Sequence, residues 1–307
     1  MSVSIRRIKI IAMIAIALAM AIVLLASPPA VVLGITSEVA PKGLPPPVYD
    51  YTIVPYEIAT DAFCLAEDLF GKNTEAKNNF VSQLLGTYLA AKDNDLIIVF
   101  NPGGWGWRFL DESPNWYSIF MGLQEEAKES GYRTLLLEYR RSINTLKSNI
   151  DEYMAITGLY PQKAITLASR LEFLTGHIPN LKIILTGESN GTIICDEAME
   201  ILKDNPQVYS IQTGTPFWHK NTKNERILVI NNNGLQPDSF SNGDFFTLIS
   251  KNIEIFLGFS PPQPKVGTVL NIFTAPGHTY SWQNPVVRRQ IEEFLNRNLP
   301  PKDADND

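Results

Sequence analysis

The sequence predicts an α/β protein in which a mostly parallel sheet is flanked by helices, preceded by one further apolar helix at the N-terminus. Short apolar runs that indicate buried strands, such as L-I-I-V-F at residues 96–100 and I-L-V-I at 227–230, alternate with longer segments of helical periodicity. Such alternation is typical of parallel sheets, because the crossover between two parallel strands needs a dozen or more residues, usually a helix. The 307 residues are enough for one domain of this kind with additional segments.

The N-terminal segment predicts a membrane anchor. Residues 1–9 carry Arg6, Arg7 and Lys9 and no acidic residue, and residues 10–26 contain no polar side chain. The apolar run is near the length of about 17–25 residues that crosses a bilayer, and the basic residues before it favour a cytoplasmic N-terminus. We therefore expect residues 10–27 to be a signal anchor in the cell membrane, with the rest of the chain outside the cytoplasm.

A cleaved signal peptide is the alternative interpretation of the same segment. The small residues Ala26 and Ser27 suit a cleavage site, and cleavage there would give a secreted protein.

Composition divides the remainder of the chain. Residues 28–50 are rich in proline and indicate an extended linker, residues 51–299 form the predicted domain, and residues 300–307 are a polar tail. With 32 acidic against 26 basic residues and no basic block beyond the N-terminus, nucleic acid is not expected as a partner. Cys64 and Cys195 fit no metal-ligand spacing, and a disulfide between them is not favoured.

Within the domain, the elements follow from periodicity and turn residues. Residues 51–92 indicate two helices, of which the second carries an apolar stripe at helical spacing. The stretch 140–160 is less regular and is a candidate for part of a lid. The predicted strands are 96–100, 133–139, 181–187, 207–214, 226–231 and 268–274, and the later helices are 115–130, 161–174, 192–202, 245–257 and 286–295.

Residues 187–191, which read G-E-S-N-G, lie between a predicted strand and a predicted helix. Only a very tight turn at such a junction brings a serine hydroxyl clear of the sheet, and Gly187 and Gly191 leave room for it because a Cβ at either would clash. The N-terminus of the next helix favours negative charge that develops near Ser189. G-x-S-x-G also occurs by chance on loops, so its weight depends on this context and on residues elsewhere in the chain.

Together with two other features, this motif makes the chain similar to the α/β-hydrolases. A loop that reads N-P-G-G-W at residues 101–105 follows the strand at 96–100, and His278 follows the last predicted strand. In that family the serine, the acid and the histidine occur in this chain order. The resemblance covers roughly residues 96–298 and consists of motif order and strand–helix alternation.

The resemblance implies a catalytic triad. Ser189 would be the nucleophile and His278 the general base. The acid is expected in the loop after the strand at 226–231, where Asp238 is preferred. Asp244 is its rival, with a lower claim because it also suits the N-cap of the following helix.

The oxyanion hole implied by the resemblance consists of the backbone N–H of Asn190 and that of Gly104 or Trp105. In the family this loop often reads His-Gly-Gly, whereas Asn101 or Pro102 stands at the histidine position here.

Two more departures from the family concern whole elements. Residues 51–92 carry no convincing signal for the antiparallel hairpin with which family members often begin. Residues 215–225, where many members insert a large cap, form only a short connection. We therefore expect a minimal cap and an open site.

The other two histidines have different expected roles. His177 lies at the N-terminal end of a strand, the wrong edge of the sheet for catalysis, and is expected to be structural. His219 lies in the loop at 215–225, where we expect a solvated side chain.

These residues predict a serine hydrolase that cleaves a carboxylic ester through an acyl-enzyme, with no metal or organic cofactor. The substrate would be a small-molecule or lipid ester, and Trp105, Trp107 and Trp218 favour an apolar acyl group. A thioesterase, an amidase or an acyltransferase would use the same residues. A non-catalytic binding or scaffold protein of the same fold at the membrane is the contrasting hypothesis.

Overall fold

The computed structural model describes residues 45–142, 152, 161–260, 267–269 and 273–302, which belong to one compact unit. The expected anchor at residues 10–27 and most of the candidate lid at 140–160 lie outside these residues. Within the described part of the chain, no helix is long and apolar enough to cross a membrane. Residues 45–50, at the end of the predicted linker, contact the domain, since Val48 N donates a hydrogen bond to Ser82 O at 2.9 Å.

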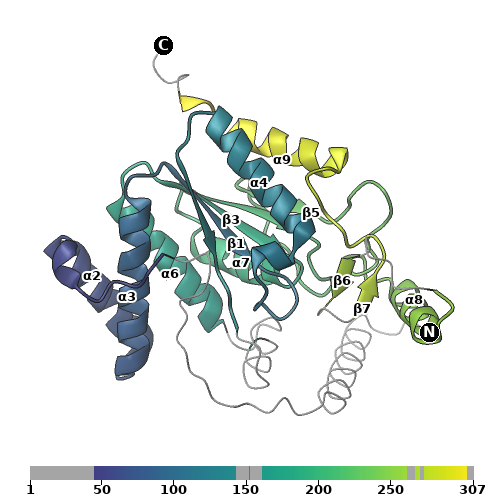
Figure 1. Cartoon of the computed structure of the whole chain (residues 1–307), viewed down its shortest axis with the longest axis horizontal. Coiled ribbons are helices and arrows are strands. Elements are labelled where there is room, and N and C mark those ends of the chain that lie inside the picture. Colours follow the sequence, from purple (N-terminus) through teal and green to yellow (C-terminus); the bar gives the residue numbers. More distant parts are fainter. Residues whose placement is uncertain (1–44, 143–151, 153–160, 261–266, 270–272, 303–307) are drawn as a thin grey trace. The chain divides into compact units, whose positions relative to one another are not determined.

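Five strands, all parallel, form the main sheet in the order β2-β1-β3-β4-β5 (Figure 1). Their bounds are β1 Leu96–Asn101, β2 Thr134–Glu138, β3 Lys182–Glu188, β4 Val208–Thr213 and β5 Ile227–Ile230. The predicted α/β class with a parallel sheet is confirmed. The chain adds β2 on one side of β1 and then β3, β4 and β5 on the other side. The carboxyl ends of β1 and β3 therefore flank the crevice where open α/β sheets bind ligands.

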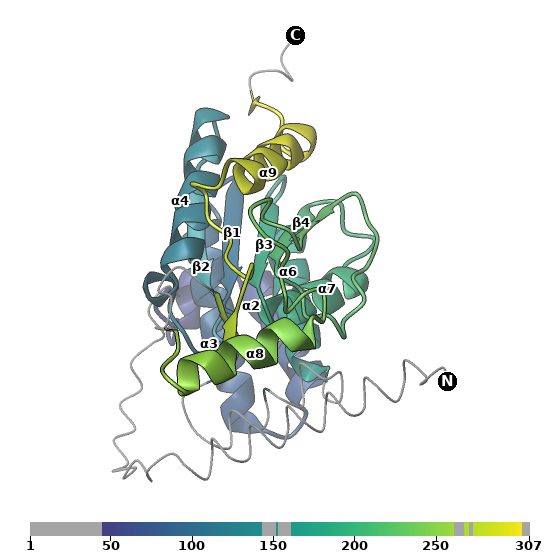
Figure 2. The ribbon, with the colours of Figure 1, turned by 90° about the vertical axis from the view of Figure 1, so that its right-hand side faces the viewer.

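Helices cover both faces of this sheet (Figures 1 and 2). One face packs against α2 (Tyr56–Phe70), α3 (Thr74–Ala91), α6 (Gln162–His177) and α7 (Gly191–Ile201). The other packs against α4 (Pro114–Glu129) and α9 (Pro285–Asn298). Short 3-10 turns, η1 (Tyr51–Ile53) and η2 (Leu110–Glu112), precede α2 and α4.

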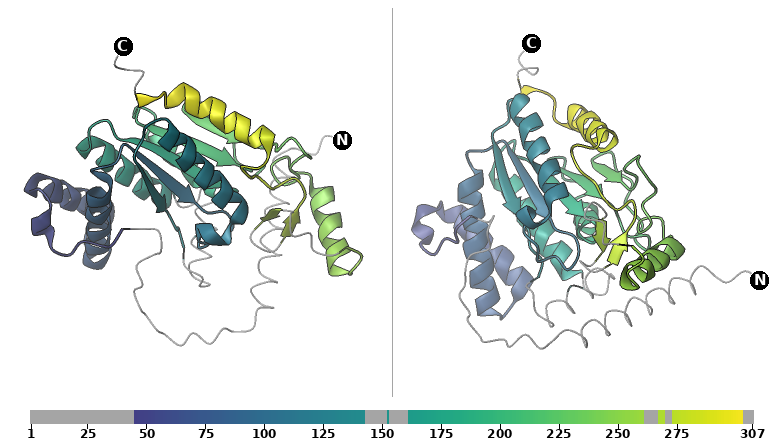
Figure 3. Two further views of the ribbon diagram at one scale, coloured as in Figure 1. Left: turned by 45° about the horizontal axis from the view of Figure 1, so that its top comes forward. Right: turned by 45° about the vertical axis from the view of Figure 1, so that its right-hand side comes forward.

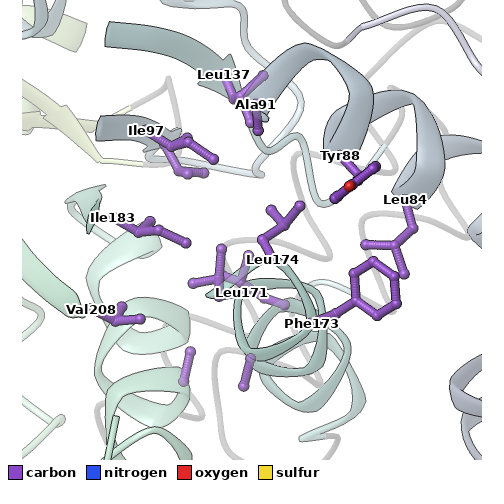
Figure 4. Close-up of a cluster of buried hydrophobic side chains, with 14 of the residues drawn as sticks. Leu84, Tyr88, Ala91, Ile97, Leu137, Leu171, Phe173, Leu174, Ile183 and Val208 are labelled. Atoms are coloured by element: carbon purple, nitrogen blue, oxygen red, sulfur yellow. The ribbon is translucent and has the colours of Figure 1, made fainter. Parts of the chain in front are cut away.

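The covered faces explain why the strands are apolar without alternation. Ile97 and Val99 point into the core beside α3 and α6, whereas Ile98 and Phe100 belong to the core beside α4 and α9. Figure 4 shows part of the first core, where side chains from α3 and α6 meet those of Ile97 and Ile183 on the sheet. A strand buried on both sides must be apolar at every position.

The last strand of the prediction is wrong. In place of one strand at 268–274 in the main sheet, the described residues form β6 (Gly267–Val269) and β7 (Phe273–Ala275), which pair antiparallel with each other in a separate sheet. The helix before them, α8 (Phe245–Phe256), contacts β7 and has no buried residue (Figure 3). A crossover helix returns the chain to a parallel sheet by packing its apolar face on that sheet, and α8 does not do so.

Other element predictions are confirmed within a few residues. Residues 51–92 form two helices, with no hairpin in the part that the structure describes. Residues 214–226, between β4 and β5, contain no helix. The connection between these two strands is thus short, as expected, and contains no helix that could cover the carboxyl edge.

Candidate active site

Ser189 occupies the turn between β3 and α7, at the carboxyl edge of the sheet. Its φ is +49°, and Asn180 is the only other described non-glycine residue with a positive φ. A left-handed conformation costs a residue with a side chain roughly 1–2 kcal/mol, and such strain is concentrated at functional sites. Ser189 N donates to Thr213 O at 2.9 Å, which ties the strained turn to the end of β4.

The two glycines of the motif allow close approach of neighbouring backbone. A Cβ on Gly187 would lie 2.9 Å from Cys195 Sγ and from Thr192 Cα, and one on Gly191 would lie 2.5 Å from Asn101 O. The strand, the helix and the loop after β1 therefore meet at these two positions with no space for a side chain. This is the turn that the sequence motif predicts.

Asp238 and His278 form a buried pair. His278 Nδ1 lies 2.8 Å from Asp238 Oδ2, and the carboxylate also accepts hydrogen bonds from Phe240 N, Ser241 N, Ser241 Oγ and the Tyr280 hydroxyl. Burial raises the pKa of Asp238, but the hydrogen bonds, that of His278 first, lower it overall below its ordinary 3.8. Because an ionised carboxylate only accepts, Nδ1 of His278 is the donor and Nε2 is left to accept a proton.

Asp244, the rival acid, has a different role. It is the N-cap of α8, where its side chain accepts from Thr247 N at 3.1 Å and from the Thr247 hydroxyl at 2.6 Å. These bonds lower the pKa of its exposed carboxyl. The structure thus brings Asp238, and not Asp244, to His278.

The serine and the histidine approach each other at the end of β4. Ser189 N is bound to Thr213 O, and His278 packs against the next residue, since a Cβ on Gly214 would collide with His278 Cε1. Ser189 Oγ is buried and has no hydrogen-bond partner among the described residues. Ser189 Oγ therefore donates no hydrogen bond to His278 in this structure.

The loop at residues 102–106, which follows β1, has every one of its carbonyl groups engaged. In chain order their partners are Arg141 Nη1, Gly106 N, Asn190 Nδ2, Ser142 Oγ and Arg141 N. Of its N–H groups, that of Gly103 donates to Glu188 Oε2 and that of Gly106 to Gly103 O. The N–H groups of Gly104 and Trp105, like that of Asn190, donate to no described residue. The resemblance implies the N–H of Asn190 and that of Gly104 or Trp105 as oxyanion donors.

A buried cluster of charges that the sequence analysis missed holds this loop. Arg141 Nη1 donates to Pro102 O at 2.7 Å, and its Nε and Nη2 both lie 2.8 Å from Glu152 Oε1. Lys163 Nζ lies 2.6 Å from Glu152 Oε2, and the side chains of Arg141 and Glu152 are fully buried. Both acidic and basic members fall in or next to the irregular stretch 140–160, where no periodicity marks a side chain as buried.

Glu188, next to Ser189, lies against the same loop. Its Oε2 accepts the N–H of Gly103 at 3.2 Å and is 3.5 Å from the Ser113 hydroxyl. Burial is the main cause of the raised pKa of Glu188, which the Gly103 hydrogen bond and the nearby His278 reduce only in part. Glu188 is thus occupied with the loop after β1.

The remaining histidines have structural partners. His177 closes α6, with Nδ1 2.8 Å from Phe173 O and Nε2 3.0 Å from Asp61, at the edge opposite Ser189, as expected. His219 is not solvated as predicted: its Nε2 lies 2.9 Å from the buried carboxylate of Asp196 on α7. Asp196 is surrounded by polar groups of the loop at 215–226, and sequence alone does not reveal this partner. Among the described residues, no three acidic, histidine or cysteine side chains converge as metal ligands.

Comparisons with known proteins find structural similarity and no match in sequence. No protein-family model matches the chain, and no curated protein matches it in sequence. A solved structure of Trichoderma reesei cutinase in complex with a C11Y4 phosphonate inhibitor is similar at 15% identity and a TM-score of 0.34, over 63% of this chain and 82% of that one. A similarity of this size carries no argument about activity, which therefore has to be inferred from the site itself.

Proposed function

We propose that this protein is a serine hydrolase that cleaves a carboxylic ester through an acyl-enzyme. The observation that carries the proposal is the buried Asp238–His278 pair beside the strained turn that holds Ser189. The five hydrogen bonds compensate the burial of the Asp238 carboxylate, which therefore stays ionised and orients the His278 ring.

His278 Nε2 takes the hydroxyl proton of Ser189 as the oxygen attacks the ester carbonyl, and it later gives the proton to the leaving alcohol. Asp238 keeps the ring in the required tautomer and stabilises the imidazolium that forms. Water then attacks the acyl-enzyme with the same base. For the Ser189 proton to reach Nε2, the Ser189 hydroxyl must form a hydrogen bond to His278 that is absent in the free protein.

The negative charge of the tetrahedral intermediate falls on the ester oxygen. In this proposal the donors are the N–H of Asn190 and that of Gly104 or Trp105. These groups donate to no described residue, whereas the other polar backbone groups of the 102–106 loop are engaged. A single donor of this kind typically contributes about 2.7–4 kcal/mol to the transition state.

An apolar substrate is favoured by the aromatic residues around His278. Phe217, Trp218, Phe240 and Phe245 form one cluster of edge-to-face contacts. The Phe240 ring lies 5.2 Å from the His278 ring, so this cluster continues to the base. We therefore propose an ester with an apolar acyl or alcohol group, either a small molecule or a lipid.

The test is turnover of p-nitrophenyl esters of rising chain length by the full-length protein in a nonionic detergent, with Ser189→Ala as the matched variant. We expect serine-dependent turnover, with kcat reduced on the order of 10⁶-fold in Ser189→Ala. The dependence on chain length measures the acyl pocket. Addition of an alcohol acceptor and product analysis separate hydrolysis from acyl transfer, and thioester and amide substrates test those alternatives.

A folded wild-type protein that neither turns over esters nor reacts with a fluorophosphonate at Ser189 would instead support the non-catalytic scaffold. Labelling and turnover measure the same serine independently, so agreement between them identifies which hypothesis holds.

We also propose that residues 10–27 anchor the domain in the cell membrane, outside the cytoplasm. The support is the sequence: basic residues followed by 17 apolar ones. Carbonate-washed membranes should retain the full-length protein, and a soluble form that begins after Ala26 would show cleavage and secretion instead.

A further inference from the structure

We propose that Arg141, held in place by Glu152 and Lys163, is a positioning residue that sets the 102–106 loop for oxyanion binding. It acts through the loop and does not touch the substrate. The kinetic part of this inference rests on the proposed hydrolase function, whereas the effect on the loop does not.

Arg141 forms hydrogen bonds with both ends of the loop. Its side-chain Nη1 donates to Pro102 O at 2.7 Å, and its backbone N donates to Gly106 O at 2.9 Å. The Ser142 hydroxyl, on the next residue, donates to Trp105 O. In a planar peptide unit the C=O of one residue and the N–H of the next point in opposite directions, so binding the carbonyls of 102, 105 and 106 fixes the N–H groups of 103, 106 and 107. Arg141 and Ser142 thus hold the peptide units on both sides of the N–H groups of Gly104 and Trp105.

The guanidinium also joins the two parts of the proposed oxyanion hole. A Cβ on Gly106, which has φ +77°, would lie 2.8 Å from Arg141 Nη2, and a Cβ on Gly191 would lie 3.2 Å from Arg141 Nη1. The Arg141 side chain therefore lies between the loop and the first residue of α7. Asn190, whose N–H is the other proposed donor, immediately precedes that residue and binds Gly104 O through Nδ2 at 3.1 Å.

The charges make this arrangement stiff. A buried guanidinium is tolerated only when it is paired and hydrogen-bonded. Glu152 pairs with Arg141, whose Nε and Nη1 make hydrogen bonds, while Nη2 makes the ion pair without a hydrogen bond to a described residue. Lys163 binds the second oxygen of Glu152 and so holds the carboxylate from the far side. Glu152 Oε1 also lies close to the loop, 3.0 Å from where a Cβ on Gly106 would be, but of the three residues Arg141 is the one that forms hydrogen bonds with the loop. Loss of Arg141 should therefore change the geometry of the donors.

The test compares Arg141→Met and Arg141→Lys with wild type in the full-length protein. For Arg141→Met we expect kcat to fall by about 10²–10³-fold, as when one oxyanion donor is lost, with KM changed less than about threefold. Arg141→Lys keeps the positive charge but not the planar guanidinium, so its kcat should lie between those of Arg141→Met and wild type. Hydrogen exchange at the amides of 103–107 should accelerate in Arg141→Met, while that of α9 stays unchanged.

Arg226 is the matched control. Its guanidinium also binds backbone carbonyls, those of Leu202, Lys203, Asn205 and Val208, but near the start of β4, at the opposite edge of the sheet. Arg226→Met should lower Tm while leaving kcat and exchange in the 103–107 loop as in wild type. An equal fall of kcat in both variants would show that Arg141 supports only overall stability and would overturn the inference.

Ser142→Ala and hydrogen exchange test the role of Arg141 if Arg141→Met does not fold or if wild type is inactive. If Arg141→Met does not fold, Ser142→Ala removes only the bond to Trp105 O; a several-fold lower kcat with faster exchange at Gly106 is expected, and unchanged values for both would count against the inference. If wild type hydrolyses no ester, the proposed function fails, but the exchange experiment still decides the positioning. Unchanged exchange in the loop of Arg141→Met would refute it even in an active enzyme.

Discussion

Two aspartates six positions apart show how the surroundings of a residue decide its chemistry. Asp238 is buried and binds a histidine, a tyrosine and a serine, whereas Asp244 is exposed and caps a helix. Both have a pKa below the ordinary value, so the pKa alone does not distinguish them. Only the contact between Asp238 and His278 does.

Substitution of the two acids should therefore have unequal effects on activity. Asp238→Asn should lower kcat by about 10⁴-fold, because the asparagine favours the wrong tautomer of the histidine. Asp244→Asn should change kcat less than a few-fold, since asparagine is an equally good N-cap and His278 is not affected. Steady-state turnover of a p-nitrophenyl ester measures both, and the opposite order would make Asp244 the acid.

Asp238 should also contribute stability that depends on pH. Its pKa is lower in the folded protein than the 3.8 of the free side chain, so the stabilisation is fully present above pH 3.8 and is lost as the pH falls through the folded-state pKa. The difference in unfolding free energy between wild type and Asp238→Asn should thus be largest at neutral pH and shrink below 3.8. Denaturant titrations at neutral and acidic pH measure it, and a difference that does not depend on pH would mean that Asp238 is not ionised in the fold.

At the scale of elements, the site is made where two strand ends meet a helix start. The end of β1 continues into the 102–106 loop, the end of β3 into Ser189, and α7 begins two residues later. These three segments touch at Gly191, whose missing side chain leaves space for Asn101 O and Pro102 O. The glycines of the motif are thus required for packing between elements as well as for the turn.

Gly191→Ala should therefore disturb the site, because its Cβ would lie 2.5 Å and 2.8 Å from two backbone oxygens that cannot rotate away. We expect kcat to fall at least tenfold and Tm to decrease. Gly176→Ala is the control: it lies in α6 with no atom within 4 Å of the added Cβ, and replacing a helical glycine should stabilise by about 0.5–1 kcal/mol. Thermal unfolding and ester turnover of both variants test this pair, and equal behaviour would show that the loop moves freely.

At the scale of the whole molecule, two cores hold the sheet from opposite sides, and α8 belongs to neither. Phe120 on α4 is 2% exposed, whereas Phe246 on α8 is 84% exposed. Ile249, Ile253 and Phe256 are also exposed, so the apolar residues of α8 contribute little to the cores. The helix is instead tied to β7 through Asn252, which exchanges hydrogen bonds with the backbone of Thr274.

The same substitution should therefore have different costs at these two positions. Phe120→Ala should lower the unfolding free energy by about 3–5 kcal/mol, since it removes buried area and leaves a cavity. Phe246→Ala should change it by no more than about 0.5 kcal/mol, as is usual for exposed positions. The midpoint of urea unfolding at unchanged slope measures both, and a large cost for Phe246→Ala would mean that α8 is covered in solution.

Sequence alone determined the features that depend on near neighbours along the chain. The parallel strands, the helices around them, the tight turn at Ser189 and the N-cap of α8 all follow from periodicity, glycine positions and short polar side chains. The candidate residues Ser189, Asp238 and His278 came from the order of motifs along the chain.

Only the tertiary structure decided which distant residues meet. It brought Asp238 to His278 across 40 positions, and it buried Arg141 with Glu152 in a stretch without periodicity. It also separated the hairpin β6–β7 from the main sheet. The physical reason is that local pattern fixes which face of an element is apolar, whereas the partner of a buried charge, or the face against which a helix packs, depends on contacts between segments far apart in sequence.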